Sequence, residues 1–173
     1  MSSSKAPRKT EKASEITALQ GALAAEHAAV YGYGVVGAML ANALRSRARS
    51  CWLAHTEARD TLQSMLVKLG ATPVAASPAY RLPFAVTGEA SAVRLAVFLE
   101  DGVVQAYLGV VAVTDVTLRS FGALAMQPPA NRAVAWRGST VAFPGMPTGG
   151  WGEWGDGSPH AGNLSPGGDS ARG

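Results

Sequence analysis

The sequence has a single cysteine, few aromatic residues and no long apolar run. Cys51 has no second cysteine to pair with among the 173 residues, so an internal disulfide is excluded, which fits a reducing cytoplasm. Aromatic side chains make up only 7% of the chain, which argues against a β-sandwich. No segment approaches the roughly 18 uninterrupted apolar residues of a membrane-spanning helix, and the polar N-terminus lacks the apolar segment of a signal peptide. We therefore expect a soluble, cytoplasmic protein without a membrane partner.

Neither positive nor negative charge is in large excess, because 15 Lys and Arg residues face 12 Asp and Glu residues. The net charge is +3, and seven of the 15 basic residues lie in the N-terminal tail and between Arg45 and Arg49. Such a distribution is typical of a solvated tail and helix end, so we expect no nucleic-acid partner. The chain also has no Gly-rich phosphate loop, no nucleophile elbow and no Cys-x-x-Cys pair. The sequence therefore contains none of these motifs from which a reaction could be predicted.

The sequence is rich in alanine, and its apolar residues recur at regular intervals. Hydrophobic residues make up 47% of the chain and recur at steps of three and four, which is the period of amphipathic helices. The pattern predicts helices over about 14–40, 43–69 and 89–114, and a fourth after Asp115 that Pro128–Pro129 interrupts and that resumes over 130–136.

The connections between these helices predict the fold. We expect a tight reversal near Leu40–Asn42 and a long connection over 70–88, which gives an all-α, antiparallel four-helix bundle over residues 13–146. The polar stretch 1–12 and the Gly/Pro-rich stretch 147–173 are expected to be disordered tails. For Trp151 and Trp154 the alternative to a disordered tail is a short binding motif.

A carboxylate lies in the middle of the inward face of the first predicted helix. Glu26 falls on the stripe that also contains Leu23 and Val30, and an unpaired buried carboxylate is costly. With a reversal near residue 41, Glu26 lies at the level of about residue 56 of the second helix. We therefore expect His55 and Arg59 to flank it.

The third predicted helix carries Glu100 and Tyr107 beside its apolar seam. The first interpretation is a buried polar network of Glu26, His55, Arg59 and Glu100 that fixes the register of the bundle.

The second interpretation is a metal site formed by Glu26, His55 and Glu100, to which His27, Glu57 or Asp60 could add a ligand. Iron, manganese or zinc suits these donors, although Arg59 would repel a cation. The third is a small-molecule pocket lined by Tyr31, Tyr33 and Tyr107.

The first predicted helix is also rich in glycine. Gly21, Gly32, Gly34 and Gly37 lower its helix propensity, and a gain that would offset this is the close approach of another helix. That helix could belong to the same chain. It could also belong to a second copy, in which case the glycine face would form a homodimer.

Four segments in order resemble a bacterial branch of the ferritin-like superfamily that is classed as a domain of unknown function. The resemblance covers about residues 14–146. It rests on the run Ala-Leu-Ala-Ala-Glu26-His27-Ala-Ala-Val-Tyr31-Gly-Tyr33-Gly-Val-Val-Gly, on Ala54-His55-Thr-Glu-Ala-Arg59-Asp60-Thr-Leu, on Pro78-Ala-Tyr80-Arg-Leu-Pro83, and on Trp136-Arg137 with Phe143-Pro144-Gly145. The resemblance implies a ferritin-like four-helix bundle and supplies no activity.

Better-known ferritin-like proteins hold two metal ions with a Glu from each of two helices and Glu-x-x-His from each of the other two. Glu26 and Glu100 match the two single carboxylates of that pattern. The second helix has Glu57-Ala-Arg-Asp60 in place of Glu-x-x-His, and the fourth has neither carboxylate nor histidine after Asp115. We therefore predict a non-catalytic binding or structural module with a polar core. The alternative is a metal-dependent oxidoreductase with a degenerate carboxylate/histidine site.

Overall fold

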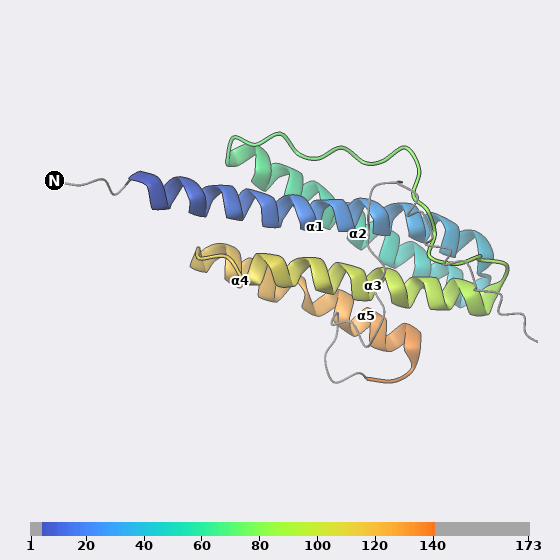
Figure 1. Cartoon of the computed structure of the whole chain (residues 1–173). Coiled ribbons are helices and arrows are strands. Elements are labelled where there is room, and N and C mark those ends of the chain that lie inside the picture. Colours follow the sequence, from blue (N-terminus) through green and yellow to red (C-terminus); the bar gives the residue numbers. More distant parts are fainter. Residues whose placement is uncertain (1–4, 141–173) are drawn as a thin grey trace, which may run out of the picture.

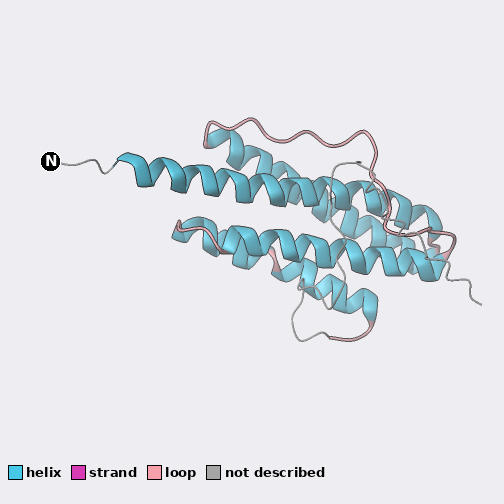
Figure 2. Ribbon diagram, viewed as in Figure 1, coloured by secondary structure: helices cyan, strands magenta, loops and turns pink. Residues whose placement is uncertain are grey.

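The computed structural model describes residues 5–140, and all the regular secondary structure in this range is helical (Figure 2). This agrees with the predicted all-α class. The helices are α1 (Lys5–Met39), α2 (Asn42–Lys68), α3 (Glu89–Val111), α4 (Val116–Ala125) and α5 (Gln127–Arg137). Within residues 5–140, no helix combines the length and the apolarity needed to cross a membrane.

The first helix is longer than its sequence pattern predicts. It begins at Lys5 rather than near residue 14, and the prediction of a disordered stretch over 1–12 is corrected from residue 5 onward. Two features explain the extension. Lys, Ala and Glu in this stretch are good helix formers, and Pro7 lies in the first turn, where a missing amide hydrogen breaks no helical hydrogen bond.

The path of the chain follows from its connections (Figure 1). After α1 the chain reverses at Leu40–Ala41, and Asn42 takes a φ of 47°, a left-handed conformation that asparagine tolerates well. The stretch 69–88 then runs back along the length of the molecule, so α3 runs in the same direction as α2. α4 and α5 return in the direction of α1. The long predicted connection is therefore a crossover.

The fourth predicted helix is divided as expected, but at a slightly different place. Asp115 caps α4 by accepting a hydrogen bond from the amide of Leu118 at 2.8 Å. The break falls at Met126, and Pro128 and Pro129 lie in the first turn of α5, where proline fits. The start of α3 is capped by the backbone and side chain of neighbouring residues rather than by an aspartate. Gly88 is the N-cap, and the Ser91 hydroxyl accepts hydrogen bonds from the amides of both Thr87 and Gly88.

Helix α1 packs against α2 on one side and α3 on the other, and α3 in turn packs against α4 and α5. The apolar core has two parts. One surrounds Tyr33 and Trp136, and the other surrounds Leu62 and Tyr107. Fully buried polar side chains are also present, and they are described below.

Of the four glycines in α1, only Gly32 lies close against a neighbouring helix. A Cβ at this position would lie 2.6 Å from Cδ1 of Leu99 on α3, so a glycine is required for the two helices to approach this closely. Gly21, Gly34 and Gly37 have open space where a Cβ would be. The close approach of α3 therefore explains the glycine at position 32. A homodimer formed through the other three glycines stays a prediction.

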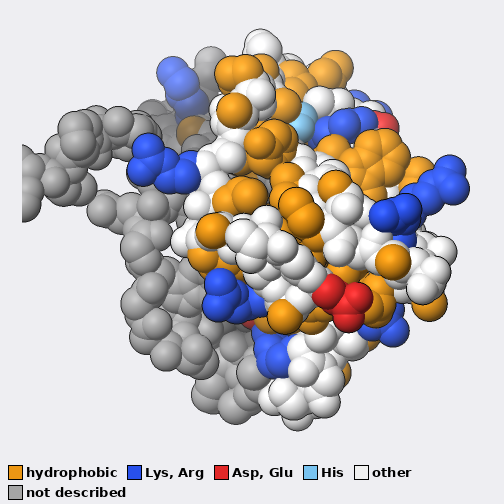
Figure 3. Space-filling model, turned by 90° about the vertical axis from the view of Figure 1, so that its right-hand side faces the viewer, with side chains coloured by type: hydrophobic (Ala, Val, Ile, Leu, Met, Phe, Trp, Pro, Cys, Tyr) orange, Lys and Arg blue, Asp and Glu red, His pale blue; other side chains and the backbone are white. Residues whose placement is uncertain are grey.

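Figure 3 shows the end of the molecule where α1 ends and where α2 and α3 begin. Hydrophobic side chains lie in the middle of this face. Lys and Arg side chains are spread around its edge rather than gathered over one helix.

Candidate functional site: a buried carboxylate and histidine network

Glu26 of α1 and His55 of α2 form the first contact of the site. Their side chains are 1% and 0% exposed, and His55 Nδ1 lies 2.7 Å from Glu26 Oε2. The register predicted from the reversal near residue 41 therefore places His55 correctly. The second oxygen, Glu26 Oε1, accepts a hydrogen bond from the Tyr107 hydroxyl of α3 at 3.0 Å. Both oxygens of this buried carboxylate are thus satisfied.

Glu100 of α3 forms the second half of the site and is also 0% exposed. Its Oε1 accepts two hydrogen bonds, from the Tyr33 hydroxyl at 2.6 Å and from Nε of Arg132 at 2.7 Å. The indole N–H of Trp136 donates to the Tyr33 hydroxyl at 2.9 Å, which fixes the direction in which Tyr33 donates. Charge-assisted bonds of this kind are stronger than bonds between neutral groups.

His55 lies between the two carboxylates. Its Nε2 is 3.4 Å from Glu100 Oε2 and also 3.4 Å from Nη2 of Arg132. If His55 were neutral, with its proton on Nδ1, Nε2 would accept from Arg132 and Glu100 Oε2 would be left without a donor. If His55 is an imidazolium, its Nε2–H faces Glu100 Oε2, and two carboxylates balance two cations. The second arrangement satisfies more of the buried charge.

The pKa shifts agree with the imidazolium form. Burial alone would lower the pKa of His55, but its contacts with Glu100 and Glu26 outweigh that effect and raise the pKa above its ordinary value. Burial alone would raise the pKa of Glu100, but His55 and Arg132 outweigh it and lower the pKa. Burial, together with the neighbouring carboxylates, raises the pKa of both Tyr33 and Tyr107. Both phenols therefore remain protonated donors.

Two of the predicted site residues lie elsewhere. Arg59 does not reach Glu26; its guanidinium pairs with the neighbouring Asp60, with Nη2 2.7 Å from Oδ1, and both side chains are partly solvent-exposed. Tyr31 is 39% exposed and packs its ring against Tyr80 of the crossover at 5.3 Å between centroids. The predictions that Arg59 belongs to the buried network and that Tyr31 belongs to a core pocket are therefore corrected.

The other residues considered as additional ligands also point away from the network. His27 is buried, but its Nε2 lies 3.1 Å from the carbonyl oxygen of Val74, so it ties the crossover to α1. Glu57 and Asp60 are exposed on the surface of α2. Burial raises the pKa of the Cys51 thiol, which agrees with an unactivated, packed cysteine.

Sequence reasoning missed two members of the network, Arg132 and Trp136. Both lie on α5, whose start at two consecutive prolines obscured its helical pattern. The signal was nevertheless present, because the buried positions Pro129, Ala133 and Trp136 recur at steps of four and three, and Arg132 lies beside that stripe. An arginine beside a buried stripe indicates a buried acidic partner, and that partner is Glu100.

The donor set does not fit the dinuclear centre of the better-known ferritin-like proteins. Three of the four oxygens of Glu26 and Glu100 already have hydrogen-bond partners, and the guanidinium of Arg132 lies where it would repel a cation. Within residues 5–140, no group of three or more His, Cys, Asp or Glu side chains is arranged to hold a metal ion. What the geometry provides is a closed network of charged hydrogen bonds among four helices.

The comparisons with known proteins give a family and no activity. Residues 18–148 match the family model described as "Domain of unknown function (DUF4439)". The crystal structure of a conserved hypothetical protein from Mycobacterium tuberculosis is similar, with 33% sequence identity and a TM-score of 0.70, over 72% of this chain and 96% of that chain. None of the curated proteins matches the chain. The chain therefore belongs to the family described as a domain of unknown function, DUF4439.

Proposed function

We propose that this chain is a ferritin-like, antiparallel four-helix bundle that acts as a non-catalytic binding or structural module, with a charge-balanced polar core in place of a metal centre. Two features support the ferritin-like arrangement. The crossover makes α2 and α3 run in the same direction, and Glu26 and Glu100 lie on α1 and α3, as in the two-carboxylate pattern of that superfamily.

The position of Arg132 carries the proposal. Its Nε bonds to Glu100 and its Nη2 lies 3.4 Å from His55, so a cation of the protein neutralises the carboxylate. The arginine is permanently charged, so it serves as a fixed substitute for an external cation. Bonds from α1, α2, α3 and α5 then converge on the same few atoms, which gives the network a role in holding the helices in register.

The alternative function is a metal-dependent oxidoreductase with Glu26, His55 and Glu100 as ligands. One observation favours it. Glu100 Oε2 is buried and accepts no hydrogen bond by strict geometry from the described residues, and buried orphan atoms are uncommon. For these three side chains to bind a metal ion, Arg132 would have to move away and His55 would have to release its proton.

The test is metal analysis by inductively coupled plasma mass spectrometry. Untagged protein is incubated with iron(II), manganese(II) or zinc(II) and desalted. We expect no stoichiometric metal in the wild type, and we expect Arg132→Gln to gain metal because the competing cation is gone. Arg59→Gln is the matched control, since it removes an arginine outside the network. Stoichiometric metal in the wild type that disappears in Glu26→Ala would overturn the proposal in favour of the oxidoreductase.

A further inference from the structure

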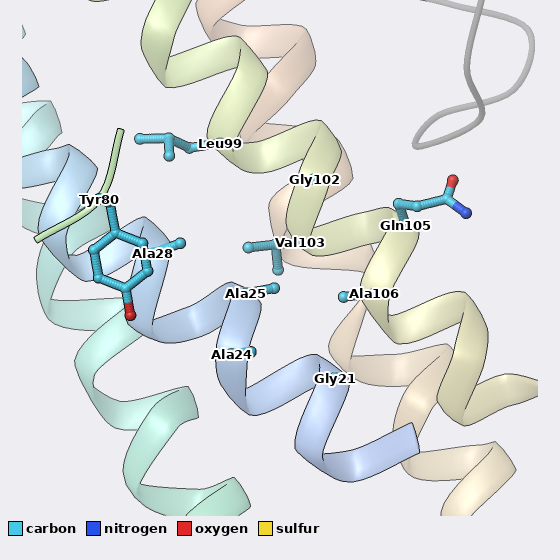
Figure 4. Close-up of a pocket in the computed structure, with 10 residues that line it drawn as sticks. All are labelled: Gly21, Ala24, Ala25, Ala28, Tyr80, Leu99, Gly102, Val103, Gln105 and Ala106. Carbon is cyan, nitrogen blue, oxygen red and sulfur yellow. The ribbon is translucent and has the colours of Figure 1, made fainter. Parts of the chain in front are cut away.

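An apolar groove lies between α1 and α3, away from the polar network. It has a volume of about 510 Å³. Small side chains form most of its wall, and Tyr80 of the crossover lies at one side of it (Figure 4). Its lining includes Gly21, Ala24, Ala28, Gly102, Gln105 and Tyr80.

The groove and the network face opposite ways. Ala24 and Glu26 are two residues apart on α1, so their side chains point about 200° apart around the helix axis. The same separation holds on α3 between Gly102, which lines the groove, and Glu100, which lies in the network. The groove is therefore on the outer surface of the α1–α3 pair, and the proposed function does not use it.

The lining of the groove determines which kind of group it can take. Among residues 5–140, no charged side chain lines it, and no atom lies within 4 Å of where a Cβ would be at Gly21 or Gly102. Such a wall suits a wide, flat apolar ring better than a charged or branched group. The Tyr80 hydroxyl and the Gln105 amide supply polar atoms at the edge. A buried indole needs an acceptor of this kind for its N–H.

The last described helix, α5, packs against α3, which is one of the two helices that form the groove. Arg137, the last residue of α5, forms an ion pair with Asp101 of α3, and Asp101 is the neighbour of the groove residue Gly102. Residues 141–173 follow, and Trp151 and Trp154 lie eleven and fourteen positions after Thr140. Eleven residues span at most about 36–40 Å, so the length of this tether allows the indoles to reach the groove.

We propose that the segment around Trp151 and Trp154 docks in the α1–α3 groove of its own chain and places at least one indole against Tyr80 and the small residues of α1. The segment lies beyond residue 148, where the family match ends, whereas the groove lies within the match. The docked segment is therefore an addition to the family domain that covers an apolar face of the bundle. Glu153, between the two tryptophans, would lie near the exposed Arg81 next to Tyr80.

Fluorine NMR on the full chain labelled with 5-fluorotryptophan tests this docking. The four tryptophan resonances are assigned with single Trp→Phe variants, and a soluble gadolinium chelate broadens those that solvent reaches. Trp136 is 6% exposed and Trp52 is 37% exposed, so they calibrate the two ends of the scale. We expect Trp151 or Trp154 to be broadened less than Trp52. We expect this protection to be lost in Gly21→Leu, which fills the groove, and kept in Gly34→Leu, an equally open position of α1 outside the groove.

Four results would overturn the proposal. The first is that both tail resonances broaden at least as much as that of Trp52 in the wild type. The second is that Gly21→Leu, with an unchanged thermal melt, leaves their protection intact. The third is protection that disappears on dilution together with a dimer in sedimentation velocity, which would make a second copy of the chain the occupant. Binding of a fluorescent anilinonaphthalene probe that Gly21→Leu abolishes while both indoles stay exposed would instead assign the groove to an apolar small molecule.

Discussion

The two buried carboxylates are the same residue type at nearly the same burial, yet their surroundings differ. Glu26 has one partner for each oxygen, His55 and Tyr107. Glu100 has two donors on one oxygen, Tyr33 and Arg132, and none in strict hydrogen-bond geometry on the other among residues 5–140. Glu26 therefore has one cationic partner, His55, and a neutral donor on its other oxygen. Glu100 instead lies against two cations, Arg132 and His55.

The cause of this difference lies in the helices that each carboxylate faces. Glu26 bonds to side chains on α2 and α3, and Glu100 bonds to side chains on α1 and α5. Only α5 contributes an arginine to the network. In the described part of the chain, His55 is the one side chain that pairs with both carboxylates, so the two halves of the network depend on it together.

The largest effect is expected from removing that shared partner. His55→Leu keeps the volume of the side chain but leaves two buried carboxylates with one cation. Breaking a buried ion pair costs about 3–5 kcal/mol, and we expect a loss of this size in the free energy of unfolding. Urea titration at neutral pH measures it. A loss similar to that of Glu26→Gln would show that His55 does not join the two halves, and negligible losses in both would show that neither side chain is buried.

Replacing either carboxylate by an amide is expected to lower the free energy of unfolding by less than His55→Leu does. The loss is expected to differ between the two positions. Glu26→Gln keeps the shape and most hydrogen bonds, so we expect the fold to persist with a loss of about 1 kcal/mol. Glu100→Gln leaves Arg132 and His55 facing a neutral amide, so we expect a loss of about 2–3 kcal/mol. Parallel urea titrations of the two variants measure the difference. Equal losses, or a larger loss for Glu26→Gln, would contradict the stronger dependence of Glu100 on cationic partners.

The raised pKa of His55 predicts how stability depends on pH. A folded-state pKa above the unfolded value of about 6.5 means that the stabilisation is complete below that pH and is lost as pH rises through the folded pKa. One proton gives a slope of at most about 1.4 kcal/mol per pH unit. Urea midpoints between pH 6 and 8 are expected to fall in the wild type and to fall less in Glu100→Gln, which removes one source of the raised pKa.

The titration stops at pH 8 so that ionisation of the Cys51 thiol contributes little to the measured change in stability. Burial also raises the pKa of the Cys51 thiol, and that shift lowers stability at higher pH with the same sign. A wild type whose stability stays flat or rises from pH 6.5 to 8 would contradict an imidazolium at position 55.

The sequence predicted the helices, the reversal at residue 41 and the contact between Glu26 and His55, because these depend on local patterns and on counting residues from one turn. It did not predict which arginine enters the core. Arg59 lies one turn beyond His55, so helical spacing allowed it to face Glu26, but its position leaves it beside Asp60 and partly exposed. Arg132 follows a break at Met126 and two prolines, so no register could be counted to it from the preceding helix.

The smallest effect is expected from Arg59→Ala, and comparing it with Arg132→Ala tests which arginine belongs to the buried network. Arg59→Ala removes a partly exposed ion pair between adjacent residues of α2, so we expect a change within about 0.5 kcal/mol in the free energy of unfolding. Arg132→Ala is the matched change on α5 and is expected to cost clearly more, because it leaves the buried charge of Glu100 with His55 as its only cation. Urea titration of both variants beside the wild type decides between the two arginines. A loss for Arg59→Ala equal to or above that for Arg132→Ala would mean that Arg59, and not Arg132, balances the charge of the two carboxylates.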